Sequence, residues 1–536
     1  MADTQLTPVV PSALTADTPT NGSSTAGARR ASGLNVRTLV QGVAGSVCIM
    51  AGSVGAGGDL IHDPILGNGP LSWIRYGHGQ QLAQAILYIG VGLLVWAWVR
   101  LGRDIIGRVV AARAVLVTGL AWIAPMIISP PTFTRDVFSY LGQGELSLRG
   151  LDPYAFGPSV LGDAIASNVH PFWQSTPAPY GPLFILVAKG VVGITGQHLI
   201  FGVIAMRLVL MIGVLLLVLA LPGLVRHMGG RLSVAFWLMI ANPMMVIHLV
   251  GGPHNDLLMV GLLAMGVLLV LNKRHVGGIA LVTLAMAIKA TAGVALPFMM
   301  WIWAGRLEGT LARRFVRATA ATIGVAGVTF GACMAVARVN FGWIGALHAP
   351  MLIVNWVNLP TGFGQLAHTI VSWFGDLPEQ PFDQMFRFIG IAALLVIVVM
   401  QWWRSREGGA DAARRAGIAL LAVAILAPPT LPWYLMWGMA LFSAAPWRRS
   451  WMAFTAGLVV LILLVYYPNG ESAMTSFWHM VWVVLGAILA GVSMLRFDPL
   501  GLRPTPSPVT LSTDVTSVPL TVPATPEAEP EHQVTG

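Results

Sequence analysis

Charged residues are scarce in this sequence. Asp, Glu, Lys and Arg make up 10% of its 536 residues, whereas an ordinary soluble domain carries about 25%. Hydrophobic residues make up 56%, and apolar runs close to the roughly 20 residues needed to cross a bilayer recur along most of the chain. These runs are too long and too unbroken for a soluble β-rich protein. The sequence therefore predicts an all-α polytopic membrane protein.

Cysteine pairs and the usual cofactor motifs are also missing. Cys48 and Cys333 both lie inside apolar runs, so we interpret them as small buried hydrophobic residues rather than as a disulfide or a metal site. There is no P-loop, no nucleotide-binding glycine pattern, no HExxH and no Cys/His cluster. An enzyme built on this chain would work without a nucleotide, and we expect no cofactor and no obligatory divalent metal.

Basic residues gather in short segments between the apolar runs, as they do in cytoplasmic loops. The net charge of +9 therefore indicates membrane topology and not nucleic-acid binding. Residues 1–34 and 498–536 are rich in small polar residues and proline, and we predict disordered cytoplasmic tails there. A transmembrane domain is predicted over 35–497, and no cleavable signal peptide is evident.

The basic clusters also give a count of crossings. If all of them face the cytoplasm, the chain crosses about 13 times (roughly 12–14), and an even number places both termini inside. The run over 183–195 is short and broken by glycine, so we expect it to lie along the outer interface or to re-enter. The run over 277–306 is too short for two full spans, so we expect a hairpin of short helices with Lys289 near its tip.

The first large outer loop opens with "TFTRDVFSYLGQGELSLRGLDPY", which starts at Thr132 directly after an apolar run. A charge at the membrane centre costs about 2.5–3.5 kcal/mol on insertion scales, so Asp136 is expected at the boundary or in a cavity. There it would be within reach of a substrate at the outer surface of the bilayer. Alternatively, Arg135 and Asp136 only cap the end of a helix.

Further polar groups are predicted on the same outer face. The turn "GGPHNDLLM" places His254, Asn255 and Asp256 side by side, where they could hold a sugar, a phosphate or a chain of water molecules, or simply form a polar turn. Lys289 has no carboxylate nearby in the sequence and suits a phosphate group, although it could instead reach for the interface.

Aromatic residues recur in the outer segments "HPFWQSTPAPYGPLF", "PPTLPWYLMW" and "YYPNGESAMTSFWHM". Trp433 and Tyr434 belong to the second of these. Aromatic faces suit sugar rings, but such residues also form the belts that anchor membrane proteins at the interface. The sequence alone leaves both interpretations open.

Five motifs together resemble the GT-C superfamily of integral-membrane glycosyltransferases. They are, in order, "TFTRDVFSYLGQGELSLRGLDPY", "PYGPLF", "GGPHNDLLM", "AIKATAGVALP" and "PPTLPWYLMW", and the resemblance covers roughly residues 35–497. The likeness is closer to the actinobacterial polyprenyl-phosphate-mannose-dependent α-1,6-mannosyltransferases, which build the mannan core of lipomannan and lipoarabinomannan.

The resemblance implies a bundle of membrane helices with the active site in the outer loops, facing the exterior of the plasma membrane. It implies a polyprenyl-phosphate-mannose donor, a lipid-linked mannan acceptor, and a catalytic carboxylate that maps onto Asp136. A second acidic residue often lies beside that carboxylate in the superfamily, but here the neighbour is Arg135. For the implied chemistry we expect the donor phosphate to be bound by Arg135, Lys289 and His254. Sugar or acceptor contacts are expected from Tyr140, Tyr180, Asn255, Asp256, Trp433 and Tyr434.

Three other functions are compatible with parts of the sequence. The chain could transfer another polyprenyl-phosphate-linked sugar, such as arabinose, because no residue distinguishes the sugars well. A flippase or transporter of lipid-linked sugars would be expected to carry charges deep in several spans and some repeat symmetry, and neither is visible. A structural scaffold would leave the clustered polar residues without a role.

Overall fold

Helices form almost all of the regular structure. The computed structural model describes residues 33–58, 60, 61, 63, 66, 67, 69–496 and 536. The one β-type pairing that joins two of these residues is an isolated bridge between Tyr466 and Ser472. The predicted all-α class is therefore confirmed. The tails predicted over 1–34 and 498–536 lie almost wholly outside the described residues.

The described residues contain six helices that are long and apolar enough to cross a membrane, or seven if one bent pair is a single span. The six are α1 (Val36–Ala56), α2 (Gly77–Ile106), α8 with α9 (Leu199–Leu210 and Ile212–Met228), α14 (Leu311–Ala337), α17 (Gln380–Arg404) and α21 (Phe477–Leu495). The bent pair is α10 (Leu232–Met239) and the π-helix η4 (Met244–Gly251), which meet at 47°.

Several expected crossings are shorter than these spans. Apolar helices of 10–17 residues are α3 with η2 (Ala112–Ile123 and Ala124–Ile127), α7 (Pro182–Thr195), α11 (Asp256–Leu271), α12 (His275–Met286), η5 with α13 (Ala290–Ala295 and Leu296–Ala304) and α20 (Arg449–Leu463). The count of about 13 crossings consequently stays a prediction, because length and composition identify six or seven.

The remaining described helices meet neither of these two sets of criteria. They are η1 (Ser72–Arg75), α4 (Asp136–Leu148), η3 (Pro158–Leu161), α5 (Ala164–Asn168), α6 (Pro171–Gln174), α15 (Trp343–Ala346), η6 (Ala349–Leu352), α16 (Leu359–Val371), α18 (Gly409–Leu426), η7 (Pro432–Tyr434) and α19 (Leu435–Phe442).

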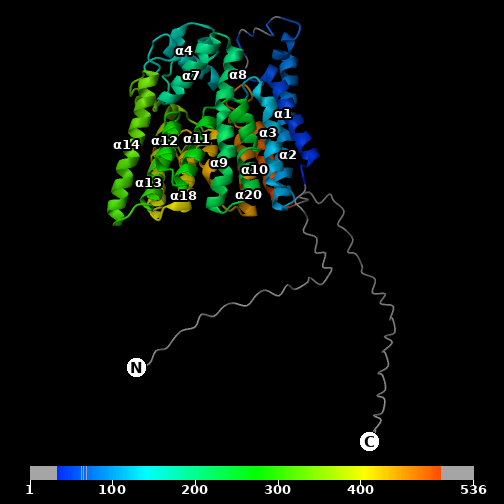
Figure 1. Ribbon diagram of the computed structural model, residues 1–536. Helices are drawn as coiled ribbons and strands as arrows, with labels where there is room; N and C mark the ends of the chain where they lie inside the picture. Colours follow the sequence, from blue (N-terminus) through cyan, green and yellow to red (C-terminus); the bar gives the residue numbers. More distant parts are fainter. Residues whose placement is uncertain (1–32, 59, 62, 64–65, 68, 497–535) are drawn as a thin grey trace. The chain divides into compact units, whose positions relative to one another are not determined.

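α4 and α7 lie together at one end of the helix bundle (Figure 1). Their backbones are close, because a Cβ atom added at Gly144 of α4 would meet the carbonyl oxygen of Ala188 at 2.4 Å. α7 covers the run 183–195 and has 14 residues, too few for a full crossing. The hairpin predicted over 277–306 is confirmed: α12 and the η5–α13 pair are both short, and Lys289 lies at the break between them.

Two glycine contacts fix α11 between its neighbours. A Cβ atom at Gly261 would lie 2.5 Å from the carbonyl oxygen of Gly213 on α9, and one at Gly266 would lie 2.7 Å from that of Gly278 on α12. Small residues allow membrane helices to approach this closely. The first residue of α11 is Asp256, so this packing also sets the position of that carboxylate.

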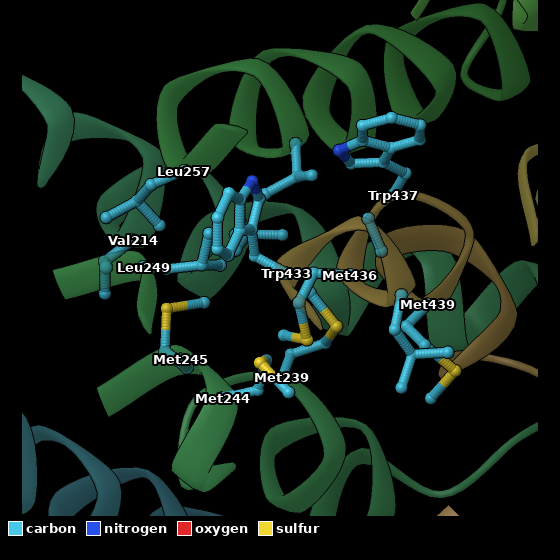
Figure 2. Packing of buried hydrophobic residues seen from close by; sticks show 14 of the residues in the cluster. Val214, Met239, Met244, Met245, Leu249, Leu257, Trp433, Met436, Trp437 and Met439 are labelled. Carbon is cyan, nitrogen blue, oxygen red and sulfur yellow. The ribbon is translucent and has the colours of Figure 1, made fainter. Parts of the chain in front are cut away.

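The buried core contains many methionines. Figure 2 shows Met239, Met244, Met245 and Met436 around Trp433, next to Trp437. Flexible thioether side chains fill irregular spaces and pack well against rings.

Two spans lie largely outside this core. Over their apolar segments, α14 and α17 are only 22% and 11% buried, so most of their surface is available to lipid.

Candidate active site

Asp136 is the first residue of α4, where the loop that follows η2 becomes helical. The loop is held in place by its backbone. The amide of Phe133 donates a hydrogen bond to the carbonyl of Pro468 (2.7 Å), and the amide of Asp136 donates to the hydroxyl of Thr134 (3.1 Å). The carboxylate of Asp136 is 18% exposed and lines two cavities. It is therefore a largely buried carboxylate that a substrate can still reach.

A buried arginine ties together the two segments that lead into this site. Arg207 on α8 is fully buried, and its guanidinium donates to the carbonyls of Ile127 (2.7 Å), Val250 (2.8 Å) and Gly251 (2.9 Å). Ile127 ends η2 and Gly251 ends η4, and the last carbonyls of a helix have no partner within it. Arg207 satisfies these groups and so fixes the loop before α4 relative to the turn before α11.

His254 lies behind Asp136. Its Nδ1 atom is 3.5 Å from Oδ2 of Asp136, and its ring stacks on Trp433 with centroids 3.5 Å apart and planes 21° apart. The imidazole is fully buried and lines neither cavity. This geometry favours a role in positioning the carboxylate. Direct contact between His254 and a donor phosphate stays a prediction, without support from the cavities.

Lys289 and Asp256 form an ion pair next to the first cavity. Nζ of Lys289 donates to both carboxylate oxygens of Asp256, at 2.9 and 3.0 Å, and lies 4.5 Å from the ring centroid of Tyr434. The indole of Trp437 donates to Oδ1 of Asp256 at 2.5 Å. Asp256 is fully buried, whereas Lys289 is 15% exposed. Asp256 is thus engaged by the protein itself, and Lys289 is the member of the pair that faces the cavity.

The environment of Asp136 changes its proton affinity. Burial raises the pKa of Asp136 to about 6, and the charge of Lys289 opposes this rise. The charge of Asp256 raises the pKa further, while side-chain hydrogen bonds with Thr134 and Trp173 lower it. α4 is not among the candidate spans, so this carboxyl group lies outside them. A carboxylate with a pKa close to neutrality is suited to accept a proton from a reacting group.

Two cavities meet at Asp136. The first has a volume of about 150 Å³ and the second about 390 Å³. Five of the lining residues are common to the two cavities: Asp136, Trp173, Ile353, Leu431 and Trp433. One carboxylate therefore faces two adjoining spaces, which is the arrangement needed for a reaction between two bound molecules.

The structure brings most of the predicted site residues together. Tyr140, Tyr180, Lys289, Trp433 and Tyr434 all line the first cavity with Asp136. Arg135 lines the second cavity and donates to the carbonyl of Asn168 at 3.1 Å. His254, Asn255 and Asp256 are fully buried and line neither.

Other lining residues were not singled out from the sequence. Trp173 lines both cavities, and His170, Tyr466 and Glu471 line the second. Their signal was the aromatic content of "HPFWQSTPAPYGPLF" and "YYPNGESAMTSFWHM", but nothing in these segments indicates which side chains face a cavity.

The described residues contain no group of three or more His, Cys, Asp or Glu side chains placed to hold a metal ion. The expectation that no divalent metal is obligatory stays a prediction.

Comparisons with known proteins match nearly all of the described chain. Residues 39–305 match the family model of the "Alpha-(1->6)-mannopyranosyltransferase, N-terminal domain", and residues 360–496 match the "MptB C-terminal domain". The α-(1→6)-mannopyranosyltransferase A of Mycobacterium tuberculosis is 38% identical over 85% of this chain and 89% of its own. The enzyme of the same name from Corynebacterium glutamicum is 30% identical over 87% of this chain and 100% of its own. No solved structure matches.

Proposed function

Because the chain belongs to the α-(1→6)-mannopyranosyltransferase family, we propose that it transfers mannose from polyprenyl-phosphate-mannose to the 6-hydroxyl of a lipid-linked α-1,6-mannan. The family membership predicted from the sequence motifs is confirmed. The observation that carries the proposal is the position of Asp136 between two cavities, with a pKa raised to about 6. A glycosyl transferase needs a base between donor and acceptor, whereas a flippase does not.

The transfer step follows from this position. The oxygen of the acceptor 6-hydroxyl attacks the anomeric carbon of the β-linked mannosyl phosphate, on the face opposite the phosphate. The hydroxyl proton passes to the carboxylate of Asp136. The bond between the anomeric carbon and the phosphate oxygen breaks, and the phosphate leaves with the electron pair. Inversion at the anomeric carbon gives an α-1,6 linkage. One carboxylate suffices because a phosphate leaves without being protonated.

The first cavity suits the donor. An ammonium group has three N–H donors, and Lys289 uses two of them on Asp256, which leaves one for a phosphate oxygen. Its positive charge also stabilises the negative charge that develops on the leaving phosphate. Nearby walls are apolar, with Met351, Pro428 and Pro429 among them, as a polyprenyl chain requires.

The membrane arrangement is part of the same proposal. The bundle would be of the GT-C type with roughly 12–14 crossings, and the site would face the exterior of the plasma membrane. Both termini would lie in the cytoplasm, which requires an even number of crossings. The grouping of Asp136, Lys289 and the aromatic side chains around adjoining cavities, beside α4, supports a site at one end of the bundle. Cysteine labelling of exposed loops in intact cells would test the orientation.

The proposal is tested by sugar transfer with the purified protein. The assay compares polyprenyl-phosphate-mannose, polyprenyl-phosphate-arabinose and GDP-mannose as donors to a short α-1,6-mannoside. We expect an α-1,6-linked product from the first donor only. Product from the arabinose donor would change the sugar and keep the reaction class. If no donor yields product, a flux assay with lipid-linked mannose in sealed vesicles would decide whether the chain is a flippase.

The rate of transfer should depend on pH through Asp136. Its carboxylate must be ionised to accept a proton, and its pKa is about 6. We therefore expect kcat/KM to fall about tenfold per pH unit well below pH 6 and to level off above pH 7. The donor phosphodiester stays ionised throughout this range and does not contribute to the slope. A flat profile between pH 5 and 7 would exclude Asp136 as the titrating base.

A further inference from the structure

The second cavity has a chemistry different from that of the first. It lies on the other side of Asp136 and contains a carboxylate of its own, that of Glu471. It also contains the imidazole of His170, the phenol of Tyr466 and the amide of Asn355. These hydrogen-bonding groups share the space with aromatic rings, including those of Phe172, Trp173 and Trp433.

Glu471 is positioned by a tight turn that packs on the Asp136 loop. The amide of Tyr467 donates to the carbonyl of Glu471 at 2.8 Å, and Gly470 within the turn has φ +93°. A Cβ atom at Gly470 would lie 3.2 Å from Cα of Thr134, so the two backbones run close together. The backbone at Glu471 is therefore fixed relative to Asp136, while its side chain is 63% exposed.

Glu471 and His170 form a polar pair on the wall of this cavity. Nε2 of His170 lies 3.7 Å from Oε1 of Glu471. Burial lowers the pKa of His170, and the nearby charge of Arg135 lowers it further, against the opposing effect of Glu471. Nδ1 of His170 accepts from the amide of Phe172 at 3.3 Å, so the neutral imidazole presents Nε2–H as a donor, and the carboxylate of Glu471 presents acceptors only. The pair can therefore hold neighbouring hydroxyl groups that act as both donors and acceptors.

We propose that the second cavity binds the terminal hexopyranose of the acceptor, with Glu471 and His170 recognising its hydroxyl groups. This inference rests on the proposed function, and it assigns the two substrates to opposite sides of Asp136. The cavity also contains the guanidinium of Arg135, which donates to the carbonyl of Asn168. The carboxylate of Glu471 offsets this positive charge and accepts hydrogen bonds from sugar hydroxyls. The rings of Trp173 and Trp433 offer apolar faces for the sugar ring. Both residues also line the first cavity, so the acceptor and the donor sugar would meet beside Asp136.

The test is the replacement Glu471→Gln in the full-length purified protein, with polyprenyl-phosphate-mannose and a synthetic α-1,6-mannobioside as substrates. A hydrogen bond to a charged group contributes enough that we expect the acceptor KM to rise about tenfold or more, with the donor KM unchanged. The matched control is Glu308→Gln, which removes an exposed carboxylate that lines neither cavity. The control should leave both constants unchanged.

Deoxygenated acceptors sharpen the test. Acceptors that lack one hydroxyl of the terminal mannose should lose affinity for the wild-type protein. At the hydroxyl bound by Glu471, the same deletion should cause no further loss in Glu471→Gln, because the interaction is already gone. A rise in donor KM alone, or unchanged acceptor KM, would overturn the assignment while the transfer reaction itself still stands.

Direct measurement of acceptor binding distinguishes failure of the proposed transfer reaction from failure of the proposed acceptor site. If the wild-type protein transfers no mannose, the quenching of tryptophan fluorescence by the mannobioside is compared between wild type and Glu471→Gln. Weaker binding by the variant supports the acceptor site even then. Equal binding, or none by the wild type, overturns it.

Discussion

Replacing Asp136 by Asn should reduce the rate of mannosyl transfer about a thousandfold, within the range typical for loss of a general base. The amide has nearly the shape of the carboxylate but cannot accept the proton of the acceptor hydroxyl. Because Asp136 is a partly exposed side chain at the start of α4, its replacement should leave the fold intact. The measurement is the initial rate of product formation at saturating concentrations of both substrates, with both KM values determined in parallel.

The control for this experiment is Asp376→Asn, which changes an exposed carboxylate outside both cavities. It should behave as the wild type. The thermal unfolding midpoint of Asp136→Asn should also match the wild type, or rise, since a largely buried carboxylate is replaced by a neutral group. If the variant keeps more than about a tenth of the wild-type rate, Asp136 is not the base, because loss of one typically costs at least about a hundredfold.

Much of the site could be predicted from local sequence. Asp136 stands directly after an apolar run, and a charge there must lie at a boundary or in a cavity. The run over 277–306 is too short for two full spans, and the hairpin predicted on that ground, with Lys289 near its tip, is confirmed. Both predictions depend only on residues close together in the chain and on the thickness of a bilayer.

The pairings across the chain could not be predicted in this way. No carboxylate lies near Lys289 in the sequence, yet the packing of α11 against α12 brings Asp256 to it from 33 residues earlier. Arg207 lies within an apolar span, and only the three-dimensional meeting of two helix ends explains its position. Glu471 reaches the site from the far end of the sequence. Such contacts depend on how the helices pack, and the residues that will meet cannot be identified from one sequence.

The number of membrane crossings shows a different limit of prediction from sequence. The charge rule counts apolar runs between basic clusters, but it does not measure the length of each helix. η5 and α13 together cover 15 residues, from Ala290 to Ala304, and α12 covers 12. Runs that look continuous in the sequence are divided in the structure at Lys289 and at the bend between α10 and η4. The break at Lys289 lies next to the first cavity, so this interruption coincides with the proposed donor site.

Replacing Lys289 by Met should affect both stability and donor binding. Removing one partner of a buried ion pair leaves the other charge without compensation, and we expect a loss of about 3 kcal/mol because Asp256 would keep only the indole of Trp437. The thermal unfolding midpoint in detergent should fall accordingly. If Lys289 also binds the donor phosphate, the KM for polyprenyl-phosphate-mannose should rise at least about tenfold.

A second replacement separates these two effects. In the double variant Lys289→Met with Asp256→Asn, no unpaired charge remains, so most of the lost stability should return. The donor KM should stay high, because the cation that faces the first cavity is still absent. Recovery of both properties in the double variant would mean that Lys289 only neutralises Asp256 and does not bind the phosphate. Recovery of stability alone would assign Lys289 a direct part in holding the donor, with Asp256 and Trp437 keeping its ammonium group in position.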